Sequence, residues 1–290
     1  MMTLPSRSVV VTGASSGIGR ATATLLADEG MLVFAGVRRE ADLESLGESA
    51  PPNLVPILLD VTDDGAVAAA ARAVETYLGN QRLHGLVNNA GLATFGPLAV
   101  QPLDSWSEQI QVNLVGTLRV TQALLPLLGT DPGRSGAPGR IVNVSSVSGR
   151  MALPFTSGYS ASKHGLEALS DCMRRELEMF CIRTIVVQPG PIATPIWGKV
   201  HDVGIAHRGT PYELLFERFL DAFVRAGEKA HSADQAARLI LHSLSAPRPR
   251  PRYALVRNRL VNWSIPRRLS DSIVDRILKR QFQLSRSPAR

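Results

Sequence analysis

Short apolar segments alternate along the chain with longer segments in which apolar residues recur every three to four positions. The segments of strand length are SVVV, MLVFAG, NLVPILL, LHGLVNN, RIVNVSS and IRTIVVQPG, at 8–11, 31–36, 53–59, 83–89, 140–146 and 182–190. Helix-period segments between them include 19–30, 63–78 and 158–180. Strands that are apolar throughout are typical of a parallel sheet covered by helices on both faces. The pattern therefore predicts a doubly wound α/β fold.

Two non-repetitive segments are interpreted from their residues. GTDPGRSGAPG at 129–139 is rich in Gly and Pro and is expected to be an exposed connection. The residues TPYE at 210–213 fit a helix start with Thr as the N-cap, and this helix is expected to run to about 226. Because ligands bind at the carboxyl ends of parallel strands, we interpret 190–226 as a lid over a substrate. The alternative is an ordinary surface excursion.

The composition favours one soluble domain. With 290 residues, of which 44% are hydrophobic, the chain can bury a large core. No segment approaches the ~20 consecutive apolar residues of a membrane span, and the first apolar run comes too early for a signal peptide. A cytoplasmic location is therefore expected. Cys172 and Cys181 have no CxxC motif or histidine cluster beside them, so we expect reduced thiols and no metal site.

Positive charge is concentrated at the C-terminal end. Residues 247–290 hold twelve Lys and Arg against Asp271 and Asp275, a balance of +10. Because the whole chain carries +7, residues 1–246 carry −3. This division predicts an α/β domain over 1–246 and a basic C-terminal extension over 247–290.

The basic extension has two parts. PRPRPRY at 247–253 should be extended, and LSDSIVDRILKRQF at 269–282 has the apolar period of a helix. Such an end is suited to resting on an anionic membrane, folding over a substrate entrance or joining a subunit interface. Packing onto its own domain is the favoured interpretation, with peripheral membrane contact as the alternative. Nucleic-acid binding is not expected, because no aromatic platform accompanies the arginines.

The first predicted strand leads into TGASSGIG, Thr12 to Gly19. Glycines at 13, 17 and 19 let the backbone turn tightly and approach a pyrophosphate, and the helix that follows directs unpaired N–H groups at the negative charge. The segment therefore favours a nucleotide site. Its spacing is G-x-x-x-G-x-G, which departs from the usual G-x-G-x-x-G.

A second motif, YSASK at 159–163, places Tyr159 and Lys163 on one helical face with only small residues between them. A free tyrosine ionises near pH ~10, too high for proton exchange at neutrality. A fixed cation favours the phenolate, so Lys163 is expected to lower the pKa of Tyr159.

Together these motifs resemble the short-chain dehydrogenase/reductase family, over about residues 6–245. The resemblance is carried, in order, by TGASSGIG, Asp60-Val61, NNAG at 88–91, Asn113, Ser146, YSASK and PG at 189–190. It implies a single Rossmann domain, a nicotinamide cofactor, interconversion of an alcohol and a carbonyl compound, and homodimers or homotetramers formed through helices near 105–128 and 158–180.

The resemblance also implies individual roles in cofactor binding. Asp60 and Val61 would edge the adenine, and Asn89, Ala90 and Gly91 would line the adenosine side. Ile192 and Thr194 would contact the nicotinamide carboxamide. The full set of expected cofactor contacts is Gly13, Ser15, Ser16, Gly17, Ile18, Gly19, Arg38, Arg39, Asp60, Val61, Asn89, Ala90, Gly91, Tyr159, Lys163, Pro189, Gly190, Ile192 and Thr194.

The end of the second predicted strand, FAGVRRE, bears on the choice between NAD(H) and NADP(H). An acid there would accept the ribose hydroxyls and repel a 2′-phosphate, whereas arginine does the reverse. Val37 stands where NAD-preferring relatives usually have Asp, and Arg38 and Arg39 follow it. NADP(H) is therefore favoured. Ser16 departs from the second basic residue that many NADP users carry in the glycine loop.

The expected catalytic residues are Asn113, Ser146, Tyr159 and Lys163. Carbonyl reduction needs a proton delivered to oxygen as hydride arrives at carbon, and we assign Tyr159 as this general acid/base. Ser146 would hold the carbonyl oxygen by a hydrogen bond. By resemblance, Lys163 also binds the nicotinamide ribose, and Asn113 holds a water that links Lys163 to solvent.

The substrate is expected to be lipophilic, because the segments that should surround it are mostly apolar. RMALPFTSG at 150–158 and PIATPIWGKV at 191–200 provide the expected contacts Leu153, Phe155, Pro191 and Trp197. The stretch 149–178 resembles the steroid and retinol dehydrogenase branch of the family, which agrees. A 3-oxoacyl reductase that acts on carrier- or CoA-linked substrates is the enzymatic alternative, and a non-catalytic NADPH-binding regulatory protein is the alternative of another class.

Overall fold

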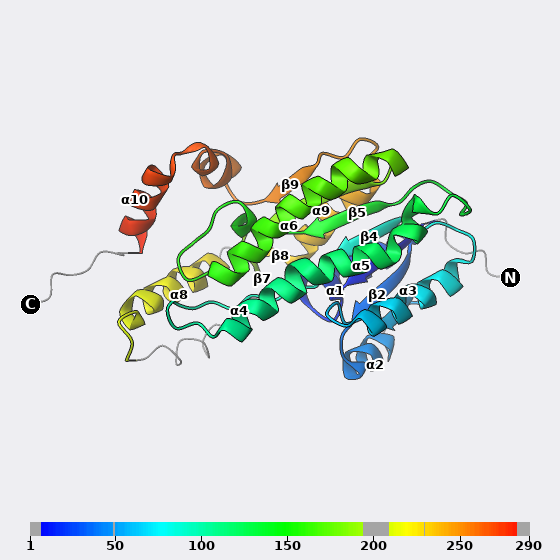
Figure 1. Ribbon diagram of the computed structural model, residues 1–290, viewed down its shortest axis with the longest axis horizontal. Coiled ribbons are helices and arrows are strands. Elements are labelled where there is room, and N and C mark those ends of the chain that lie inside the picture. The colour runs from blue at the N-terminus through cyan, green and yellow to red at the C-terminus, as the bar shows by residue number, and fades with distance from the viewer. Residues whose placement is uncertain (1–6, 49, 194–208, 229, 283–290) are drawn as a thin grey trace, which may run out of the picture.

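A computed structural model describes residues 7–48, 50–193, 209–228 and 230–282 (Figure 1). Its centre is a seven-stranded parallel sheet in the order β3-β2-β1-β4-β5-β6-β9. The strands of this sheet are β1 (Ser8–Thr12), β2 (Leu32–Val37), β3 (Leu54–Leu58), β4 (Gly85–Asn88), β5 (Arg140–Val144), β6 (Arg183–Pro189) and β9 (Arg252–Leu255), while β7 (Ile192–Ala193) and β8 (His231–Ser232) pair separately. The α-helices are α1 (Gly17–Asp28), α2 (Glu40–Glu48), α3 (Asp64–Leu78), α4 (Leu103–Ile110), α5 (Gly116–Leu125), α6 (Ser157–Glu176), α8 (Glu213–Glu228), α9 (Ala233–Ser245) and α10 (Asp271–Gln281). The predicted doubly wound α/β fold is confirmed.

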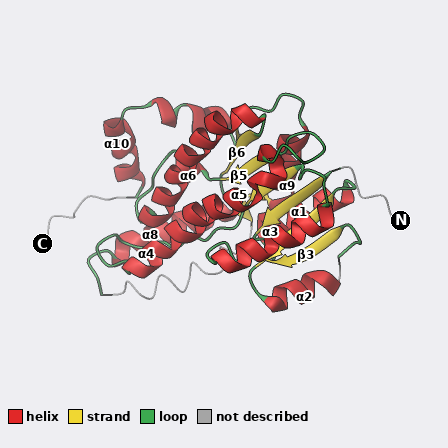
Figure 2. Ribbon diagram, turned by 45° about the vertical axis from the view of Figure 1, so that its right-hand side comes forward, coloured by secondary structure: helices red, strands yellow, loops and turns green. Residues whose placement is uncertain are grey.

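Helices cover both faces of the sheet (Figure 2), and each face has its own apolar core. Successive residues of a strand contribute to these two cores in turn. Val10 belongs to the core that contains Val67 of α3 and Val120 of α5. Its neighbours Val9 and Val11 belong to the core that α1 and α9 close on the other face. Side chains alternate between the faces of a strand, so a strand that is apolar throughout is buried on both.

The strand order reverses beside β1. β2 and β3 extend the sheet on one side of β1, whereas β4 pairs with β1 on its other side. Doubly wound folds bind ligands outside the carboxyl ends of the strands at such a reversal. Here the carboxyl ends of β1 and β4 lead into the glycine loop and into NNAG.

Several helices differ in extent from the prediction. The helix expected at 158–180 is α6 followed by a 3₁₀ turn, Leu177–Phe180. α8 begins at Glu213 and runs to Glu228, with the Thr210 side chain accepting a hydrogen bond from the Tyr212 N–H at 3.3 Å. α2 and α9 were not identified from the sequence, although α9 starts with a capping box. The long helix near 105–128 consists of α4, α5 and two π-helical turns, η1 (Gln111–Val115) and η2 (Pro126–Thr130).

This continuous helical stretch, Leu103–Thr130, is long and apolar enough to cross a membrane by length and composition alone. In the structure it packs inside the domain, where α4 contacts α6 and α5 contacts α3 and β4. We therefore interpret it as a core helix of the fold.

The C-terminal part of the chain begins inside the sheet. β9 pairs with β6 from Val186↔Arg252 to Pro189↔Leu255. A domain that ended at residue 246 would lack this edge strand, so only the residues after Leu255 lie beyond the sheet. They form a π-helical turn, η6 (Leu260–Ser264), a 3₁₀ turn, η7 (Pro266–Arg268), and α10.

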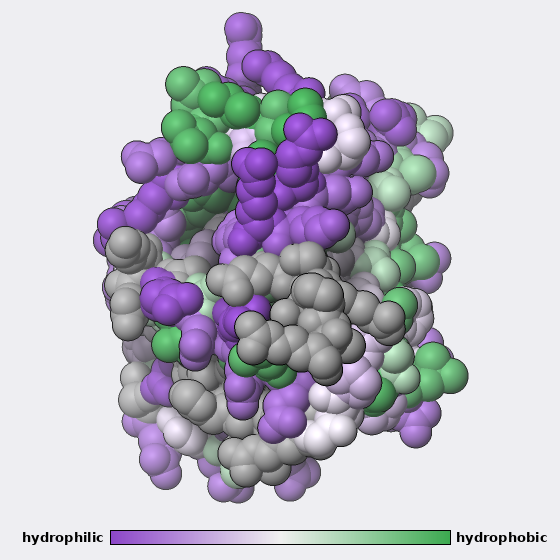
Figure 3. All heavy atoms as spheres, turned by 90° about the vertical axis from the view of Figure 1, so that its left-hand side faces the viewer, coloured by the Kyte–Doolittle hydropathy of each residue, from purple (hydrophilic) through white to green (hydrophobic). Residues whose placement is uncertain are grey.

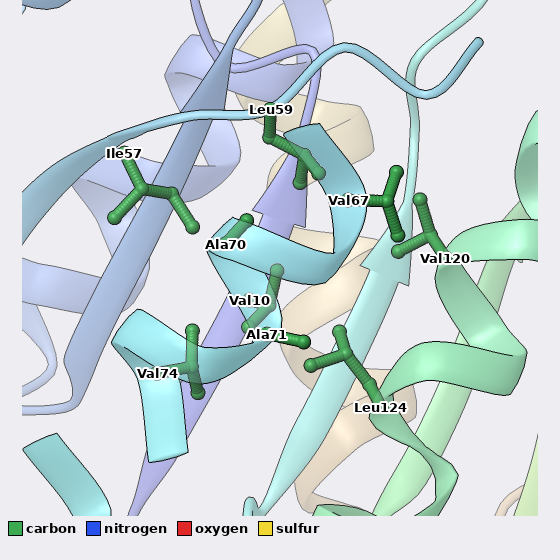
Figure 4. Close-up of a pocket in the computed structure, with 9 residues that line it drawn as sticks. All are labelled: Val10, Ile57, Leu59, Val67, Ala70, Ala71, Val74, Val120 and Leu124. Carbon is green, nitrogen blue, oxygen red and sulfur yellow. The ribbon is translucent and has the colours of Figure 1, made fainter. Parts of the chain in front are cut away.

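A small apolar cavity of about 10 Å³ lies between α3, α5 and the sheet (Figure 4). It is lined by Val10, Ile57, Leu59, Val67, Ala70, Ala71, Val74, Val120 and Leu124. A volume this small is at the lower limit for one water molecule, and these side chains offer no hydrogen bond to hold it. The cavity is a packing gap in the core and has no part in a binding site.

Candidate active site

The glycine loop and NNAG approach each other so closely that side chains would not fit between them. A Cβ atom on Gly13 would lie 2.8 Å from Ala90 Cα, and one on Gly19 would lie 2.1 Å from the Gly13 carbonyl oxygen. Gly13 and Gly17 also have positive φ, +65° and +55°, a conformation that glycine adopts without steric cost. Ser16 is the N-cap of α1, which starts at Gly17. The loop therefore brings bare backbone and a helix N-terminus to the carboxyl end of β1.

Hydrogen bonds fix the loop against the end of β4. The Thr12 hydroxyl accepts from the backbone N–H groups of Asn89 and Ala90 at 3.0 and 2.9 Å. The Asn89 side-chain amide donates to the carbonyls of Thr12 and Gly13 at 3.0 and 3.1 Å. The Asn89 side chain therefore holds the glycine loop against the end of β4, and the two together form the cradle that is proposed for a dinucleotide. Thr12 was not identified as a site residue, although it is the first residue of the motif.

Asp60 and Val61 follow β3 at the same end of the sheet. One oxygen of the Asp60 carboxylate accepts hydrogen bonds from the backbone and side chain of Thr62 at 2.9 and 2.7 Å. The Val61 carbonyl accepts from Arg119 at 2.7 Å, and its side chain packs against Gly116 of α5. Asp60 is thus held in a turn and remains half-buried.

The two arginines after β2 differ in their surroundings. The Arg39 guanidinium binds the Asp42 carboxylate through two hydrogen bonds of 2.8 Å. Arg38 directly follows the buried Val37 and is exposed. Of the two residues expected to meet a 2′-phosphate, Arg39 is therefore already engaged by a carboxylate, and Arg38 is the better placed.

Tyr159, Lys163 and Ser146 come together where α6 crosses the end of β5. Ser146 is the second residue after β5 and is buried; its side chain accepts a hydrogen bond from the Ser148 N–H at 3.1 Å and also interacts with the Tyr159 hydroxyl. Lys163 is 5% exposed, its ammonium donates to the Val144 carbonyl at 2.9 Å, and it lies 5.9 Å from the centre of the Tyr159 ring. The predicted neighbours are therefore brought together.

The predicted lowering of the Tyr159 pKa is wrong for the protein alone. Burial raises the pKa of Tyr159, and the hydrogen bond with Ser146 opposes this only in part. Lys163 does not reverse it, because its ammonium is directed at a backbone carbonyl and not at the phenol oxygen. Burial in turn lowers the pKa of Lys163 to about 8, against the opposing charge of Glu167. Desolvation disfavours the charged form of each group.

Asn113 lies in the π-helical turn η1, where a helix often departs from regular geometry at a functional site. Its side chain is fully buried and exchanges hydrogen bonds of 2.9 Å with the backbone of Leu92, and it donates to the Ser162 hydroxyl at 3.0 Å. A Cβ atom on Gly91 would lie 3.1 Å from the Asn113 side-chain oxygen and 3.7 Å from the Lys163 nitrogen. Asn113, Gly91 and Lys163 therefore meet at one point.

The turn after β6 contains the remaining expected contacts. Pro189 ends β6, and the Gly190 N–H donates to the Leu255 carbonyl of β9 at 2.9 Å. Pro191 is exposed, and Ile192 is buried in β7. Thr194 and Trp197 lie outside the described residues. The edge strand β9 thus supports the turn that was expected to face the nicotinamide.

A cluster of phenylalanines lies beside Tyr159. The Phe95 ring is 6.1 Å from the Tyr159 ring and 4.8 Å from the Phe223 ring of α8, centre to centre. Phe155 adopts a left-handed conformation (φ +65°) that is uncommon for a bulky residue. Its ring packs edge-on against two α8 rings at 5.4 Å each. The described members of this phenylalanine cluster are Phe95, Phe155, Phe216, Phe219, Phe223 and Phe282.

Most of this cluster was not predicted. Phe155 was expected, and Leu153 is half-buried in the same loop, but the α8 rings and Phe282, which follows α10, were not identified as site residues. The Phe219 and Phe282 rings lie 6.0 Å apart. Figure 1 shows α8 and α10 at the end of the molecule opposite the N-terminus. The sequence signal that could have identified the α8 rings is the helical spacing of Phe216, Phe219 and Phe223, three and four residues apart.

Residues 7–203 match the family described as short chain dehydrogenase. The chain belongs to this family. Among the described residues, no cluster of His, Cys, Asp and Glu is suited to hold a metal ion.

Similarity to individual relatives indicates which branch of the family this short-chain dehydrogenase resembles. It is 35% identical to an NADPH-dependent 3-dehydrocapnine reductase from Ornithobacterium rhinotracheale, over 96% of this chain and 100% of the relative. It is 34% identical to retinol dehydrogenase 5 from Mus musculus, over 95% and 90%. A short-chain dehydrogenase from Burkholderia cenocepacia, solved in complex with NADP, superposes with a TM-score of 0.71 at 25% identity, over 96% and 99%. The retinol and hydroxysteroid dehydrogenase branch expected from the sequence is therefore confirmed.

The glycine loop of this short-chain dehydrogenase fits the nicotinamide cofactor that the family binds. The space that Cβ atoms at positions 13 and 19 would fill is closed by backbone, and the α1 N-terminus presents unpaired N–H groups to a pyrophosphate. Tyr159 and Lys163 lie at the same end of the sheet as the glycine loop, with Gly91 of NNAG next to the Lys163 ammonium. The site therefore combines a dinucleotide cradle with a phenol and an ammonium.

Proposed function

We propose that this oxidoreductase uses NADP(H) to interconvert an alcohol and a ketone or aldehyde on a lipophilic substrate, with Tyr159 as general acid/base. The observation that carries the proposal is that the Ser146 side chain stands close enough to the Tyr159 hydroxyl to act on its pKa, beside a buried Lys163 and next to the dinucleotide cradle. A phenol and a serine hydroxyl that are neighbours can both bind one carbonyl oxygen.

Each residue has a defined part in this reaction. When bound, the cofactor supplies the hydride to the carbonyl carbon. Ser146 donates a hydrogen bond to the carbonyl oxygen as negative charge develops there. Tyr159 donates its proton to that oxygen, and its raised pKa keeps the phenol protonated at neutral pH, which suits the reduction. Lys163, with a pKa of about 8, is mostly charged at neutral pH and stabilises the phenolate left behind. Asn113 anchors the backbone of Leu92 beside it.

Arg38 supports the choice of NADP(H). Arg38 is exposed and directly follows Val37, the position where an acid would select NAD(H), and the relative from Ornithobacterium is NADPH-dependent. Replacing Arg38 by alanine should raise the KM for NADPH about 10–100-fold and leave that for NADH nearly unchanged, because a hydrogen bond to a charged group contributes about 1.5–3 kcal/mol. Arg39→Ala is the control and should change the NADPH KM less, since Asp42 already binds Arg39. Equal effects on both cofactors would contradict the assignment.

The phenylalanine cluster supports a lipophilic substrate. Six phenylalanines pack around Tyr159 at the N-terminal end of α6, and α8 and Phe282, which follows α10, contribute rings from outside the sheet. Leu278 of α10 joins the cluster, and an open groove of about 470 Å³ lies between α10 and residues Ala152 and Pro154. The phenylalanine cluster suits apolar carbon, while Asp275 and Lys279 of α10 add a carboxylate and an ammonium at the groove beside it. We infer that α8 and α10 together form the cover of the substrate site; residues 194–208 of the predicted lid lie outside the described residues.

The function is tested by following NADPH absorbance across lipophilic ketones, retinoids and steroids, short ketones and thioester-linked 3-oxoacyl compounds, with NADH run in parallel. We expect turnover with NADPH that rises with the apolar size of the ketone. Turnover confined to thioesters would favour the 3-oxoacyl reductase instead. NADPH binding without any turnover would favour a regulatory protein.

We also propose that the segment after β9 contacts an anionic membrane. Exposed apolar side chains gather there, with Leu260 67% and Val261 62% exposed, joined by Ile265, Ile273 and Ile277. In Figure 3, apolar (green) atoms lie among strongly hydrophilic (purple) ones at the top of the face. Apolar residues interspersed with arginines match a surface of negatively charged lipid headgroups.

Vesicle sedimentation tests this contact. The protein should bind phosphatidylserine-containing vesicles, release at high salt, and bind pure phosphatidylcholine vesicles weakly. Replacing both Leu260 and Val261 by glutamate should weaken binding by about 10-fold or more, since apolar burial is lost and each glutamate repels the surface. Leu98→Glu changes a comparably exposed leucine (74%) outside the segment and should have no effect. Equal losses in both proteins would contradict the proposal.

A further inference from the structure

A row of ionisable side chains continues along α6 beyond the predicted catalytic pair. Tyr159, Lys163, Glu167 and Asp171 are each four residues apart, so they lie on one helical face. Lys163 and Glu167 are 5% and 3% exposed, respectively. A buried carboxylate therefore stands one turn beyond a buried ammonium, and the sequence analysis assigned it no role.

The Glu167 carboxylate is held from three other segments. One oxygen accepts a hydrogen bond from the Gln188 side chain of β6 at 2.8 Å. The other accepts from Arg252 of β9 at 2.8 Å and from Arg150, at the start of the predicted substrate loop, at 3.3 Å. Gln188 directly precedes Pro189 and Gly190, the turn expected to face the nicotinamide. Glu167 thus joins the catalytic helix to the cofactor turn, the substrate loop and the edge strand.

Lys163 and Glu167 are enclosed together. A Cβ atom on Gly149 would lie 2.9 Å from the Lys163 carbonyl oxygen and 3.1 Å from Glu167 Cγ, so no side chain separates α6 from the chain at this point. In the part of the chain that the structure describes, the groups around Lys163 are Tyr159 and Glu167 on α6, Asn113 on η1 and the Val144 carbonyl on β5. Among these, Glu167 is the group with a charge opposite to that of Lys163. Arg150 and Arg252 face Glu167 from outside, and Arg252 also binds Asp171 at 2.9 Å.

We propose that Glu167 is a positioning residue for Lys163: from one turn farther along α6 its buried carboxylate, fixed by Gln188, Arg252 and Arg150, favours the charged form of an ammonium that the Val144 carbonyl holds. The proposal rests on the role proposed above for Lys163. Burial lowers the pKa of Lys163 to about 8, and the charge of Glu167 opposes a further decrease. Neutralising Glu167 should therefore lower the pKa of Lys163, so that more of the lysine is uncharged at neutral pH.

The chain contains four lysines, Lys163, Lys199, Lys229 and Lys279, so each can be followed separately. Protein labelled with ¹³C at lysine Cε gives one NMR signal per lysine, and Lys163→Arg assigns the signal of interest. In Glu167→Gln, which retains the shape of the side chain, the Lys163 midpoint should fall by about 1 pH unit or more. In Arg252→Gln, where Glu167 is less neutralised, the midpoint should rise. No turnover is needed for either measurement.

Asp171→Asn is the matched control. It also removes one negative charge from α6 and one partner of Arg252, but it lies two turns from Lys163, about 12 Å along the helix. The Lys163 signal should titrate as in the unaltered protein, even if stability falls. A Lys163 midpoint that is unchanged in both Glu167→Gln and Arg252→Gln would overturn the proposal and leave Glu167 as a structural clamp.

Activity provides the second readout. If the protein reduces ketones with NADPH, the alkaline limb of the kcat/KM profile should move to lower pH in Glu167→Gln and remain in place in Asp171→Asn. A shifted Lys163 midpoint in a protein that turns over no substrate would support the role of Glu167 and refute the proposed reaction. An unshifted midpoint in an active enzyme would do the reverse, so the two failures are distinguishable.

Discussion

Replacing Tyr159 by phenylalanine should lower kcat for ketone reduction by about 10²–10⁴-fold, the contribution usual for a positioned proton donor. The ring, its contact with Phe95 and its place on α6 are retained, and only the hydroxyl that binds Ser146 is removed. NADPH affinity and thermal stability should therefore change little. Single-turnover absorbance measurements at saturating NADPH would separate this loss of chemistry from slow product release.

Tyr77→Phe is the matched control for this change. Tyr77 is 51% exposed on α3 and packs edge-on against Phe34, so the same hydroxyl is removed far from α6. It should leave kcat unchanged. A Tyr159→Phe protein with at least a tenth of the original kcat would mean that another group supplies the proton.

Replacing Gly19 by alanine should abolish NADPH binding and lower the free energy of unfolding by about 3 kcal/mol, the upper end of the cost usual for overpacking. The added Cβ would lie 2.1 Å from the Gly13 carbonyl oxygen and 2.4 Å from the Asn89 amide nitrogen. The first contact is with backbone, so relief requires the glycine loop and α1 to separate. Fluorescence titration with NADPH and chemical denaturation measure the two effects.

Gly47→Ala is the control for this prediction. Gly47 lies exposed in α2, and its added Cβ would meet only a Pro56 side-chain carbon at 3.9 Å. Alanine there should stabilise the protein by up to about 1 kcal/mol, because it is the better helix former. NADPH binding that survives in Gly19→Ala would show that the loop does not hold the cofactor in the way described.

The sequence alone predicted those features in which local pattern and spatial position coincide. A parallel sheet collects the ends of its strands at one edge, so motifs after β1, β4, β5 and β6 had to meet. The four-residue spacing of Tyr159 and Lys163 placed both on one face of α6. The alternation of apolar strands with helix-period segments was therefore sufficient for the fold, and the motif positions placed the predicted site residues at one edge of the sheet.

Other features depend on contacts between residues far apart in the chain, and no local pattern reports them. Phe95, Phe219 and Phe282 meet beside Tyr159 only because α8 and α10 fold back over the site. The pairing of Arg39 with Asp42 depends on side-chain conformation. The raised pKa of Tyr159 follows from burial, which outweighs the charge that the YSASK spacing suggested. The sequence analysis assigned Arg252 to the basic C-terminal extension because its ion pair with Glu167, 85 residues earlier, leaves no local pattern.

The long separation in sequence between β6 and β9 has a consequence for synthesis of the protein. β6 ends at Pro189, but the strand that completes its outer side spans Arg252–Leu255. Until the ribosome has released these residues, the nascent chain exposes an unpaired edge of β6, and Glu167 lacks the Arg252 contact. Parallel pairing over so long a loop is slow to form. α6 thus reaches its final surroundings only after residues up to Leu255 have emerged, and a chain that stops before Arg252 would leave an edge open to aggregation.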